Sequence, residues 1–361
     1  MYDIRLYKEG EEIDIISFIN QFTMIKHTYE GWLWEYTKNP IDKNLFAIIR
    51  DDNNNLIATQ ALIPIFLTYR SKIILSAKSE STLVHPEYRG KNLFSRVYKL
   101  IFEILDDISC IWGFTGALKP FKNAGFEIAG HIQNTFTPLK FFKALHFFSR
   151  RYVFKKLRFK NIFYLLGFFC IGIIISIRNM IFNWIALHRR HEIEISECAQ
   201  DEIDFDKYTD VFTKSMPEVV TIYRDCRLMS WWIFNNPYRE HKIFGIKRND
   251  VLLGYFITSY DDEMVILRDF VMCEILNNEE GSYIGAWIMQ YFKSEGYGIL
   301  FNQIYNNDNE YYNKYISPIL KKGYVAFPNK LPVVFKSFSE KYNHLNNNKL
   351  WYFTGLFAEL I

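Results

Sequence analysis

The stretch 82–96 constrains this chain more than any other, because a short apolar run, a basic turn and the start of an apolar helix follow one another there. Residues 82–84 are typical of a strand, and Pro86 opens a turn that contains Gly90. The residues after the turn are apolar at helical spacing: Leu93, Phe94, Val97, Leu100, Ile101, Ile104 and Leu105. The first N–H groups of a helix have no partner within it, and the helix dipole favours negative charge there. The sequence therefore predicts an anion-binding turn, with an ordinary strand–turn–helix carrying exposed basic residues as the alternative.

The turn itself resembles a known cofactor loop. The run 86–91 (Pro-Glu-Tyr-Arg-Gly-Lys), followed by an apolar helix, resembles the loop with which GNAT N-acyltransferases bind the pyrophosphate of acyl-CoA. That family's pattern is Arg/Gln-x-x-Gly-x-Gly/Ala, which Arg89 fits, whereas Asn92 and Phe94 stand where small residues are usual. Asparagine tolerates the left-handed backbone conformation better than most residues, so the turn is compatible with Asn92. The resemblance implies acetyl-CoA or another acyl-CoA as co-substrate, in contact with Leu83, Val84, Arg89, Gly90, Lys91, Asn92, Leu93 and Phe94.

The order of elements around the turn is that of the GNAT fold, an α/β (α+β) fold with a mixed sheet and helices on both faces. Apolar and β-branched runs predict three strands before the turn, separated by turn signals. A helix, a strand, a helical turn and a last strand follow it, within roughly the first 140 residues. The predicted ranges are 45–50, 56–69, 72–84, 94–105, 110–114, 120–126 and 130–137.

After residue 192 the chain repeats features of its first half. Two spacings recur in the same order: Trp34 to Pro40 as Trp231 to Pro237, and Pro120 to Gly125 as Pro318 to Gly323. A duplicated supersecondary unit is the simplest account of such ordered matches. We therefore expect tandem GNAT folds, with an N-terminal cofactor-binding domain at 1–140, a basic and apolar helical linker at 141–191, and a degenerate C-terminal domain at 192–361.

The two halves differ at the position of the basic turn. In the second half, Glu279 and Glu280 stand where the first half has basic residues. Carboxylates beside a pyrophosphate would repel it. We therefore expect one cofactor site, in the N-terminal half, with the C-terminal half serving as scaffold and as a wall of the acceptor pocket.

The linker 141–191 has basic flanks around an uncharged run at 161–177. Such a run is at the short edge of what spans a bilayer. Basic flanks together with aromatic residues suit helices that lie in a membrane interface. Peripheral membrane contact through 150–190 and a buried pair of helices between the domains stay open as alternatives, and a single membrane span is the least favoured of the three.

The composition limits the class of protein and its compartment. The 43 basic and 40 acidic residues nearly balance, which argues against a nucleic-acid partner. The five cysteines are scattered without a Cys-x-x-Cys motif, so we expect neither a disulfide framework nor a metal site. The first ten residues are polar and charged, unlike a signal peptide. These features favour the cytoplasm, with the segment 150–190 as a contact to the inner face of the membrane.

The resemblance also implies a reaction, in which the acceptor amine attacks the thioester directly and the protein removes a proton from the amine. On an extended strand, Glu80 shares a face with Thr82 and Val84. Glu80 is therefore the predicted general base, with a solvated edge carboxylate as the alternative and His85 as a second candidate. A tyrosine often protonates the leaving thiolate in this family, but Phe121 stands at that position and cannot donate a proton.

Aromatic residues before the first central strand are the predicted roof of the acceptor pocket, namely His27, Tyr29, Trp34 and Tyr36. Aromatic faces stack on sugar rings. A packed aromatic cap on the sheet is the alternative, because the same residue type recurs at Trp231. The expected function is an acyl-CoA-dependent N-acetyltransferase acting on a small amine. An amino sugar is the preferred acceptor because the chain, with its basic linker, resembles tandem GNAT proteins of bacterial surface-polysaccharide loci, and no residue by itself indicates a sugar. The alternatives are an aminoacyl transferase of the peptidoglycan-bridge type and a non-catalytic protein that binds CoA or another ligand.

Overall fold

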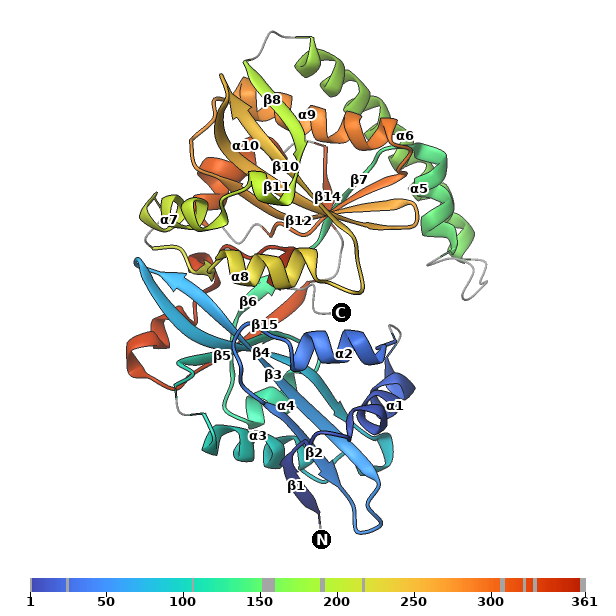
Figure 1. The fold of residues 1–361 in the computed structure, drawn as a ribbon. Helices are drawn as coiled ribbons and strands as arrows, with labels where there is room; N and C mark the ends of the chain where they lie inside the picture. Colours follow the sequence, from blue (N-terminus) through green and yellow to red (C-terminus); the bar gives the residue numbers. More distant parts are fainter. Residues whose placement is uncertain are drawn as a thin grey trace.

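The computed structural model describes residues 2–23, 26–105, 107–150, 160–188, 192–215, 218–305, 309–320, 323–326 and 330–357. Parts of the predicted linker, 151–159 and 189–191, lie outside the described residues, and the side chains of 160–171 are not described either. Two mixed β-sheets organise the chain, one in the lower and one in the upper half of Figure 1. This mixed α/β architecture is the fold class that the sequence predicts.

The first sheet has the order β1-β2-β3-β4-β5-β15-β6, and a short strand, β9, also pairs with β3. The strands are β1 (Asp3–Leu6), β2 (Phe46–Arg50), β3 (Leu56–Tyr69), β4 (Lys72–Val84), β5 (Cys110–Phe114), β6 (Glu127–Ile132), β9 (Thr221–Ile222) and β15 (Leu331–Ser337). Strands β2, β3 and β4 form an antiparallel meander, and β4 pairs with β5 in parallel. Arg70 and Ser71 close the β3–β4 hairpin with positive φ angles of 50° and 56°, as a two-residue turn requires.

The second sheet has the order β14-β7-β13-β12-β11-β10-β8. The strands are β7 (Thr135–Pro138), β8 (Ile193–Cys198), β10 (His241–Arg248), β11 (Val251–Asp261), β12 (Met264–Met272), β13 (Ile299–Asn302) and β14 (Val325–Ala326). Strands β10, β11 and β12 form an antiparallel meander, and β12 pairs with β13 in parallel. The second sheet therefore repeats the strand directions of the first.

The two sheets exchange strands, which the predicted strand at 130–137 does not anticipate. That prediction is wrong in its extent, because the chain leaves the first sheet after β6 and enters the second as β7, beside β13. In return, β15 from the C-terminal part of the chain lies between β5 and β6. The polar residues Gln133 and Asn134 separate the two strands and carry the chain from one sheet to the other.

Helices cover both faces of the first sheet because alternate residues of β2 point to opposite sides. Phe46 and Ile48 belong to the core shared with α1 (Glu12–Phe22) and α2 (Tyr29–Tyr36). Ala47 and Ile49 belong to the core shared with α3 (Leu93–Glu103) and α4 (Leu118–Asn123). Helix α3 is amphipathic and buries Leu93, Val97, Tyr98 and Ile101 against the sheet.

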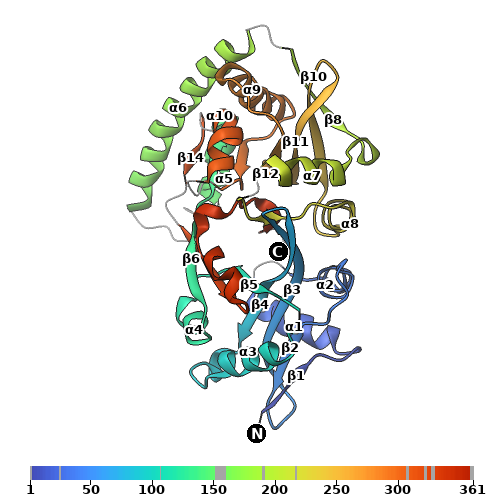
Figure 2. The ribbon, with the colours of Figure 1, turned by 90° about the vertical axis from the view of Figure 1, so that its left-hand side faces the viewer.

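The second sheet is covered by α7 (Phe205–Ser215), α8 (Cys226–Met229), α9 (Asn278–Ser294) and α10 (Ser317–Leu320). Helices α5 (Phe141–Phe148) and α6 (Lys160–Leu187) lie between β7 and β8, which are both strands of the second sheet, and α6 runs along the outside of this half (Figure 2). Helix α6 packs on α9. Within the described part of the chain, no helix combines the length and the hydropathy needed to cross a bilayer.

The repeated tryptophans meet where the two halves join. The rings of Trp34, on α2, and Trp231, just after α8, stack with centroids 4.8 Å apart and planes 22° apart. Each indole N–H donates a hydrogen bond to the other residue's carbonyl oxygen, at 2.9 and 3.0 Å. The main hydrophobic core includes side chains of both halves, so the halves are packed together rather than connected only by the chain.

Candidate functional site

The predicted anion-binding turn is an exposed loop between β4 and α3. Pro86–Tyr88 forms a single 3-10 turn, after which the backbone becomes extended at Arg89. Gly90 has φ +81° and open space around it, and Asn92 adopts the left-handed conformation with φ 60°. The Nε atom of Arg89 donates a hydrogen bond to the Val84 carbonyl, at 3.3 Å. The loop therefore has the left-handed positions that let a backbone curl around a bound anion.

The N-terminus of α3 is open, whereas its counterpart in the second half is closed. Asn92 makes no side-chain capping bond, and the first turn of α3 contains no acidic residue. At α9, Asn277 accepts hydrogen bonds from two backbone N–H groups, and the Glu280 carboxylate bonds back to the Asn277 N–H. Arg248 also binds Glu280, at 2.7 Å. An incoming phosphate would find its N–H donors already occupied at α9, but not at α3.

Beside this loop, β4 separates from β5. The parallel pairing covers only Ser76 to Lys78 on β4, and the strand continues without a β5 partner to Val84. In the second sheet β12 likewise leaves β13 after Leu267. There, however, the Tyr311 hydroxyl bonds both the N–H and the carbonyl of Met272, at 2.7 and 2.9 Å. In the second sheet, a side chain of the protein thus bonds the backbone groups of β12 at the strand separation. The corresponding part of β4 in the first sheet has no β5 partner beside the loop.

A β-bulge and a buried polar network shape β4 at this separation. The β3–β4 register shifts at Gln60, opposite Ser81, which has φ 45°. The fully buried Gln60 amide donates to Ser79 and to the Glu80 carbonyl and accepts from Thr82, at 2.6–3.2 Å. Because both strands contribute to the network, it holds the bulge in one geometry.

The predicted base, Glu80, lies on the α2 side of this bulge. Its carboxylate forms a 2.6 Å ion pair with Lys78, which is 3% exposed, while the Glu80 side chain is 18% exposed. Glu80 is thus held by a buried lysine rather than extended into solvent. Its role as general base stays a prediction.

The structure adds a second carboxyl group that the sequence analysis missed. The Glu35 side chain is fully buried, and neither of its oxygens has a hydrogen-bond partner of good geometry, although the Tyr36 hydroxyl weakly favours the charged form. Burial raises the pKa of Glu35 to about 8, the charge of Glu80 adds to this rise, and the charge of Lys78 opposes it. All but one of the residues 31–36 are buried, so the sequence pattern of this part of α2 does not distinguish Glu35 from its buried neighbours.

The four predicted acceptor residues lie on α2 or just before it but differ in exposure. His27 is 5% exposed, and its Nδ1 lies 3.1 Å from the Tyr238 hydroxyl and 3.7 Å from a Glu35 oxygen. The Tyr36 hydroxyl bonds Ser81 of the bulge, at 2.7 Å. Tyr29 is 50% exposed, whereas Trp34 is buried against Trp231. Trp34 lies where the alternative of a packed aromatic cap on the sheet would place it. Tyr36 connects α2 to the bulge, and His27 lies next to Glu35.

The predicted cofactor residues fall into an exposed and a buried group. Residues 89–92 are exposed, and the Lys91 ammonium lies 4.3 Å from the centre of the Tyr88 ring. Leu83 and Val84 pair with β3, and Leu93 is buried under α3. Phe94 packs edge-on against Phe121, with ring centroids 5.0 Å apart, so the bulky residue in the motif fills space under the helix.

A hydroxyl group lies near Phe121, the residue that stands where a proton-donating tyrosine is expected. Tyr98, on α3, packs beside Phe121 and is hydrogen-bonded to Ser79 at 2.7 Å, where β4 leaves β5. Burial raises the pKa of Tyr98 well above its ordinary value of 10, so the phenol stays protonated. Its position one turn into α3 gives no sequence signal beyond an amphipathic helix.

Over the described ranges, no group of three or more His, Cys, Asp or Glu side chains is arranged to hold a metal ion.

Comparisons with known proteins show the fold but not a close relative. No protein-family model matches the chain, and no curated protein matches it significantly in sequence. A GCN5-related N-acetyltransferase from Anabaena variabilis superposes with a TM-score of 0.59 and 12% identity, over 94% of this chain and 73% of that one. A probable N-acyltransferase from Enterococcus faecalis gives 0.59 and 8%, over 93% and 73%. The N-myristoyltransferase of Saccharomyces cerevisiae, with bound myristoyl-CoA, gives 0.59 and 12%, over 93% and 79%. The chain therefore has the GNAT fold that these N-acyltransferases share.

Proposed function

We propose that the chain is an acyl-CoA-dependent N-acyltransferase whose donor, acetyl-CoA, binds at the loop 89–92. The observation that supports this most is the open N-terminus of α3 next to the strand separation. Unpaired N–H groups and the exposed Arg89 and Lys91 suit a pyrophosphate. The unpaired side of β4 suits the amide groups of pantetheine, which need backbone partners. We infer one such site, in the first half, because α9 is capped by Asn277 and Glu280.

The reaction that we propose is direct acyl transfer. The acceptor nitrogen attacks the thioester carbon, the C–S bond breaks, and the amine loses a proton to Glu80. In this proposal the CoA thiolate takes a proton from Tyr98, whose ring packs beside Phe121. Support for these roles comes from the ion pair that orients Glu80 and from the hydrogen bond that fixes Tyr98 on Ser79.

The acceptor that we propose is a small cationic amine, with an amino sugar as the preferred class. Two carboxyl groups, Glu35 and Glu80, lie against one lysine, Lys78, on the α2 side of the bulge. Glu35 is protonated at neutral pH, but an approaching ammonium group would favour its charged form and so meet two carboxylates and one lysine, which supports a positively charged acceptor. The reaction takes place in the cytoplasm in this proposal, at or near the inner face of the membrane.

Isothermal titration with acetyl-CoA tests the donor site. We expect Arg89→Ala to weaken binding about 10- to 100-fold, because a charge-assisted bond to phosphate is lost. Arg248→Ala is the matched control, since Arg248 lies at the closed end of α9 and should leave the affinity unchanged. Equal affinity of Arg89→Ala and the natural protein would refute the assignment.

Thiol release against a panel of amines then tests turnover. Release with an amino sugar supports the proposed reaction. Binding without release on any amine favours the non-catalytic alternative, and a chain that does not bind CoA but transfers from aminoacyl-tRNA is an aminoacyl transferase.

A further inference from the structure

Helix α6 presents an apolar face to the outside of the molecule. The large apolar side chains exposed on it, each by 36–66%, are Ile173, Ile174, Ile177, Met180, Ile181, Trp184 and Ile185. The opposite side is anchored by Asn179, which is 6% exposed and donates to Thr137 at 2.7 Å and to the Gly323 carbonyl at 3.4 Å. At 3.6 residues per turn, the seven side chains spread over about 140° of the helix, directly away from Asn179.

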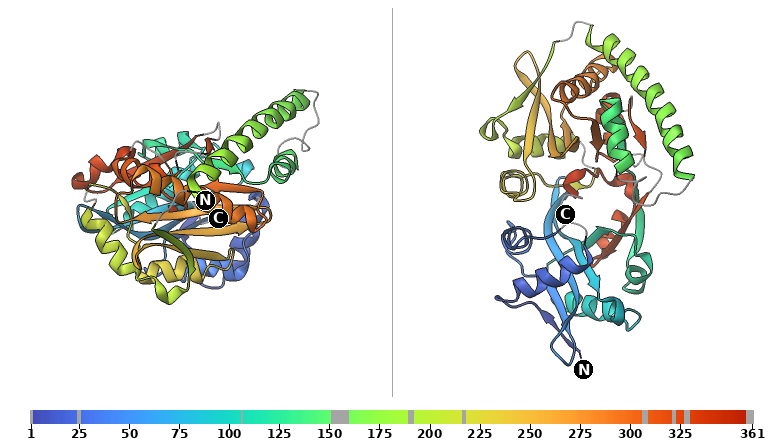
Figure 3. Two further views of the ribbon diagram at one scale, coloured as in Figure 1. Left: turned by 90° about the horizontal axis from the view of Figure 1, so that it is seen from above. Right: turned by 90° about the vertical axis from the view of Figure 1, so that its right-hand side faces the viewer.

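This arrangement reverses the usual pattern of a surface helix. A helix packed on a globular protein keeps its apolar face inward and its polar face in water. Contiguous exposed apolar side chains of this kind mark an interaction surface. Phe142 on the neighbouring α5 is 78% exposed and extends the same part of the molecule. Figure 3 shows α5 and α6 projecting from the body of the protein.

The charge of the segment that contains α5 and α6 indicates the kind of partner that this face would bind. Between Glu127 and Glu192 the sequence contains no acidic residue but eleven lysines and arginines. The rest of the chain has 32 basic and 40 acidic residues, so the whole positive excess lies in this segment. A second copy of the chain docking through this face would bring two such segments together and repel. An anionic surface complements it.

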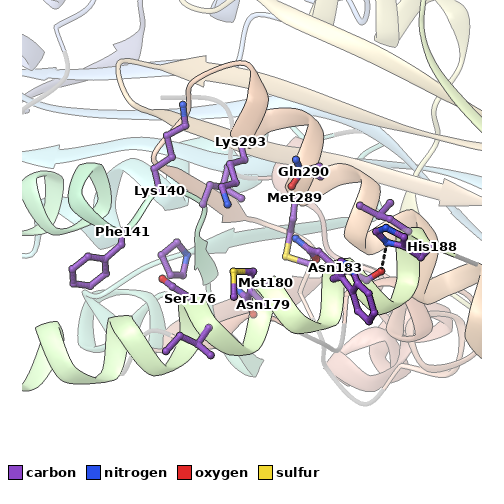
Figure 4. A pocket seen from close by; sticks show the side chains of 15 residues that line it. Lys140, Phe141, Ser176, Asn179, Met180, Asn183, His188, Met289, Gln290 and Lys293 are labelled. Atoms are coloured by element: carbon purple, nitrogen blue, oxygen red, sulfur yellow. Dashed lines mark hydrogen bonds between the residues drawn. The ribbon is translucent and has the colours of Figure 1, made fainter.

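A groove of about 510 Å³ lies beside the apolar face, between α5, α6 and α9. Figure 4 shows Phe141, Met180 and Met289 around it, with Lys140 and Lys293 toward α9. Ammonium groups next to an apolar channel match the headgroup and the acyl chain of an anionic lipid.

We propose that the α5–α6 segment docks the protein on an anionic phospholipid bilayer, with α6 lying in the plane of the interface. The exposed isoleucines and Trp184 enter the acyl boundary, and Lys140 and Lys293 beside the groove remain among the headgroups. The inference goes beyond acyl transfer, since neither loop 89–92 nor the β4 bulge takes part in it.

Co-sedimentation of the full chain with vesicles tests the proposal. We expect the protein to bind vesicles of phosphatidylcholine with 30% phosphatidylglycerol, about tenfold or more above its binding to phosphatidylcholine alone, and to dissociate as salt rises. The double variant Ile177→Asp/Ile181→Asp should lose at least tenfold in partitioning, because two apolar contacts become charged. Ile275→Asp is the matched control, as Ile275 is 61% exposed outside α5 and α6.

A second pair of variants tests the headgroup contact. Lys140→Glu/Lys293→Glu should weaken the preference for anionic vesicles while leaving acetyl-CoA affinity and thermal unfolding unchanged, and Lys207→Glu on α7 should change nothing. Equal binding to both vesicle types, unaltered binding of the isoleucine variant, or a dimer in sedimentation that the isoleucine variant dissociates would each overturn the proposal.

Discussion

At the scale of residues, Trp34 and Trp231 join the two halves through matched contacts. Each ring covers the other and each N–H is bonded to the partner's backbone. Buried indole groups need such partners, because an unpaired N–H in a core costs free energy. The sequence repeat therefore marks a contact between the halves as well as a feature within each.

Replacing Trp34 should destabilise the protein strongly. We expect Trp34→Ala to lower the free energy of unfolding by about 3–5 kcal/mol in a urea titration, through the cavity and the lost stacking. The double variant Trp34→Ala/Trp231→Ala should lose less than the sum of the single variants, because both remove the same contact. Additive losses would show that the stacking contributes nothing of its own.

Glu35 should make the protein less stable as the pH rises. Its pKa is about 8 in the folded state and about 4.5 in the unfolded one, so its contribution is fully present below pH 4.5 and is lost as the pH approaches 8. The groups around it are His27, Tyr36, Tyr238, Lys78 and Glu80. Burial lowers the pKa of His27 below its ordinary 6.5. His27 therefore lowers the stability of the fold only as the pH falls below 6.5, outside the range in which Glu35 is tested.

Comparison with Glu35→Gln isolates this effect. Between pH 6.5 and 8, the free energy of unfolding of the natural protein should fall by about 1.5 kcal/mol relative to the variant. Thermal unfolding of both proteins across this range is the measurement, with Glu87→Gln, an exposed glutamate, as the control. Parallel curves would mean that Glu35 is ionised in the fold.

At the scale of elements, the loop before α3 depends on two residues with positive φ. A β-branched residue in place of Gly90 would be strained by the positive φ angle, although nothing lies near the position of its Cβ. Glycine in place of Asn92 would adopt the left-handed conformation without strain. The departure from the family's pattern at Asn92 is therefore structurally tolerable.

The two substitutions should have opposite effects on acetyl-CoA binding. Gly90→Val should weaken binding about tenfold or more, whereas Asn92→Gly should keep or improve it, since the phosphate-binding N–H groups keep their directions. Titration calorimetry measures both, and circular dichroism checks that α3 persists. A loss of binding in Asn92→Gly would assign the amide side chain itself to the ligand.

Much at this scale can be predicted from sequence, because apolar periodicity and turn residues act locally. The structure has the predicted strands at Phe46–Arg50, Leu56–Tyr69 and Lys72–Val84, and α3 begins one residue before its predicted start. The bulge at Ser81 and the burial of Glu35 depend on neighbours far along the chain, and no local pattern encodes them. The roles of Glu80 and of the cofactor residues stay predictions.

At the scale of the whole molecule, the exchange of β7 and β15 means that neither sheet is encoded by one continuous segment. The division into 1–140, 141–191 and 192–361 stays a prediction, and the exchange gives it a physical test. Without β15, both β5 and β6 lose their shared neighbour in the first sheet.

A fragment of residues 1–140 should therefore not fold stably. We expect rapid proteolysis and poorly dispersed amide NMR signals, because exposed strand edges and an open core remain. Adding a peptide that contains 330–357 should restore protection if the missing strand is the cause. A protected fragment without that peptide would show that the first sheet is complete within its own segment.

The position of β15 also affects how the chain is made. Its residues leave the ribosome about 200 residues after β5, which at about 5–20 residues per second is a delay of roughly 10–40 s. Throughout that time the first sheet has two unpaired edges, at β5 and β6, and edges of this kind recruit other chains. The nascent protein is thus most prone to aggregation before its last strand emerges, and chaperone demand should peak late in translation.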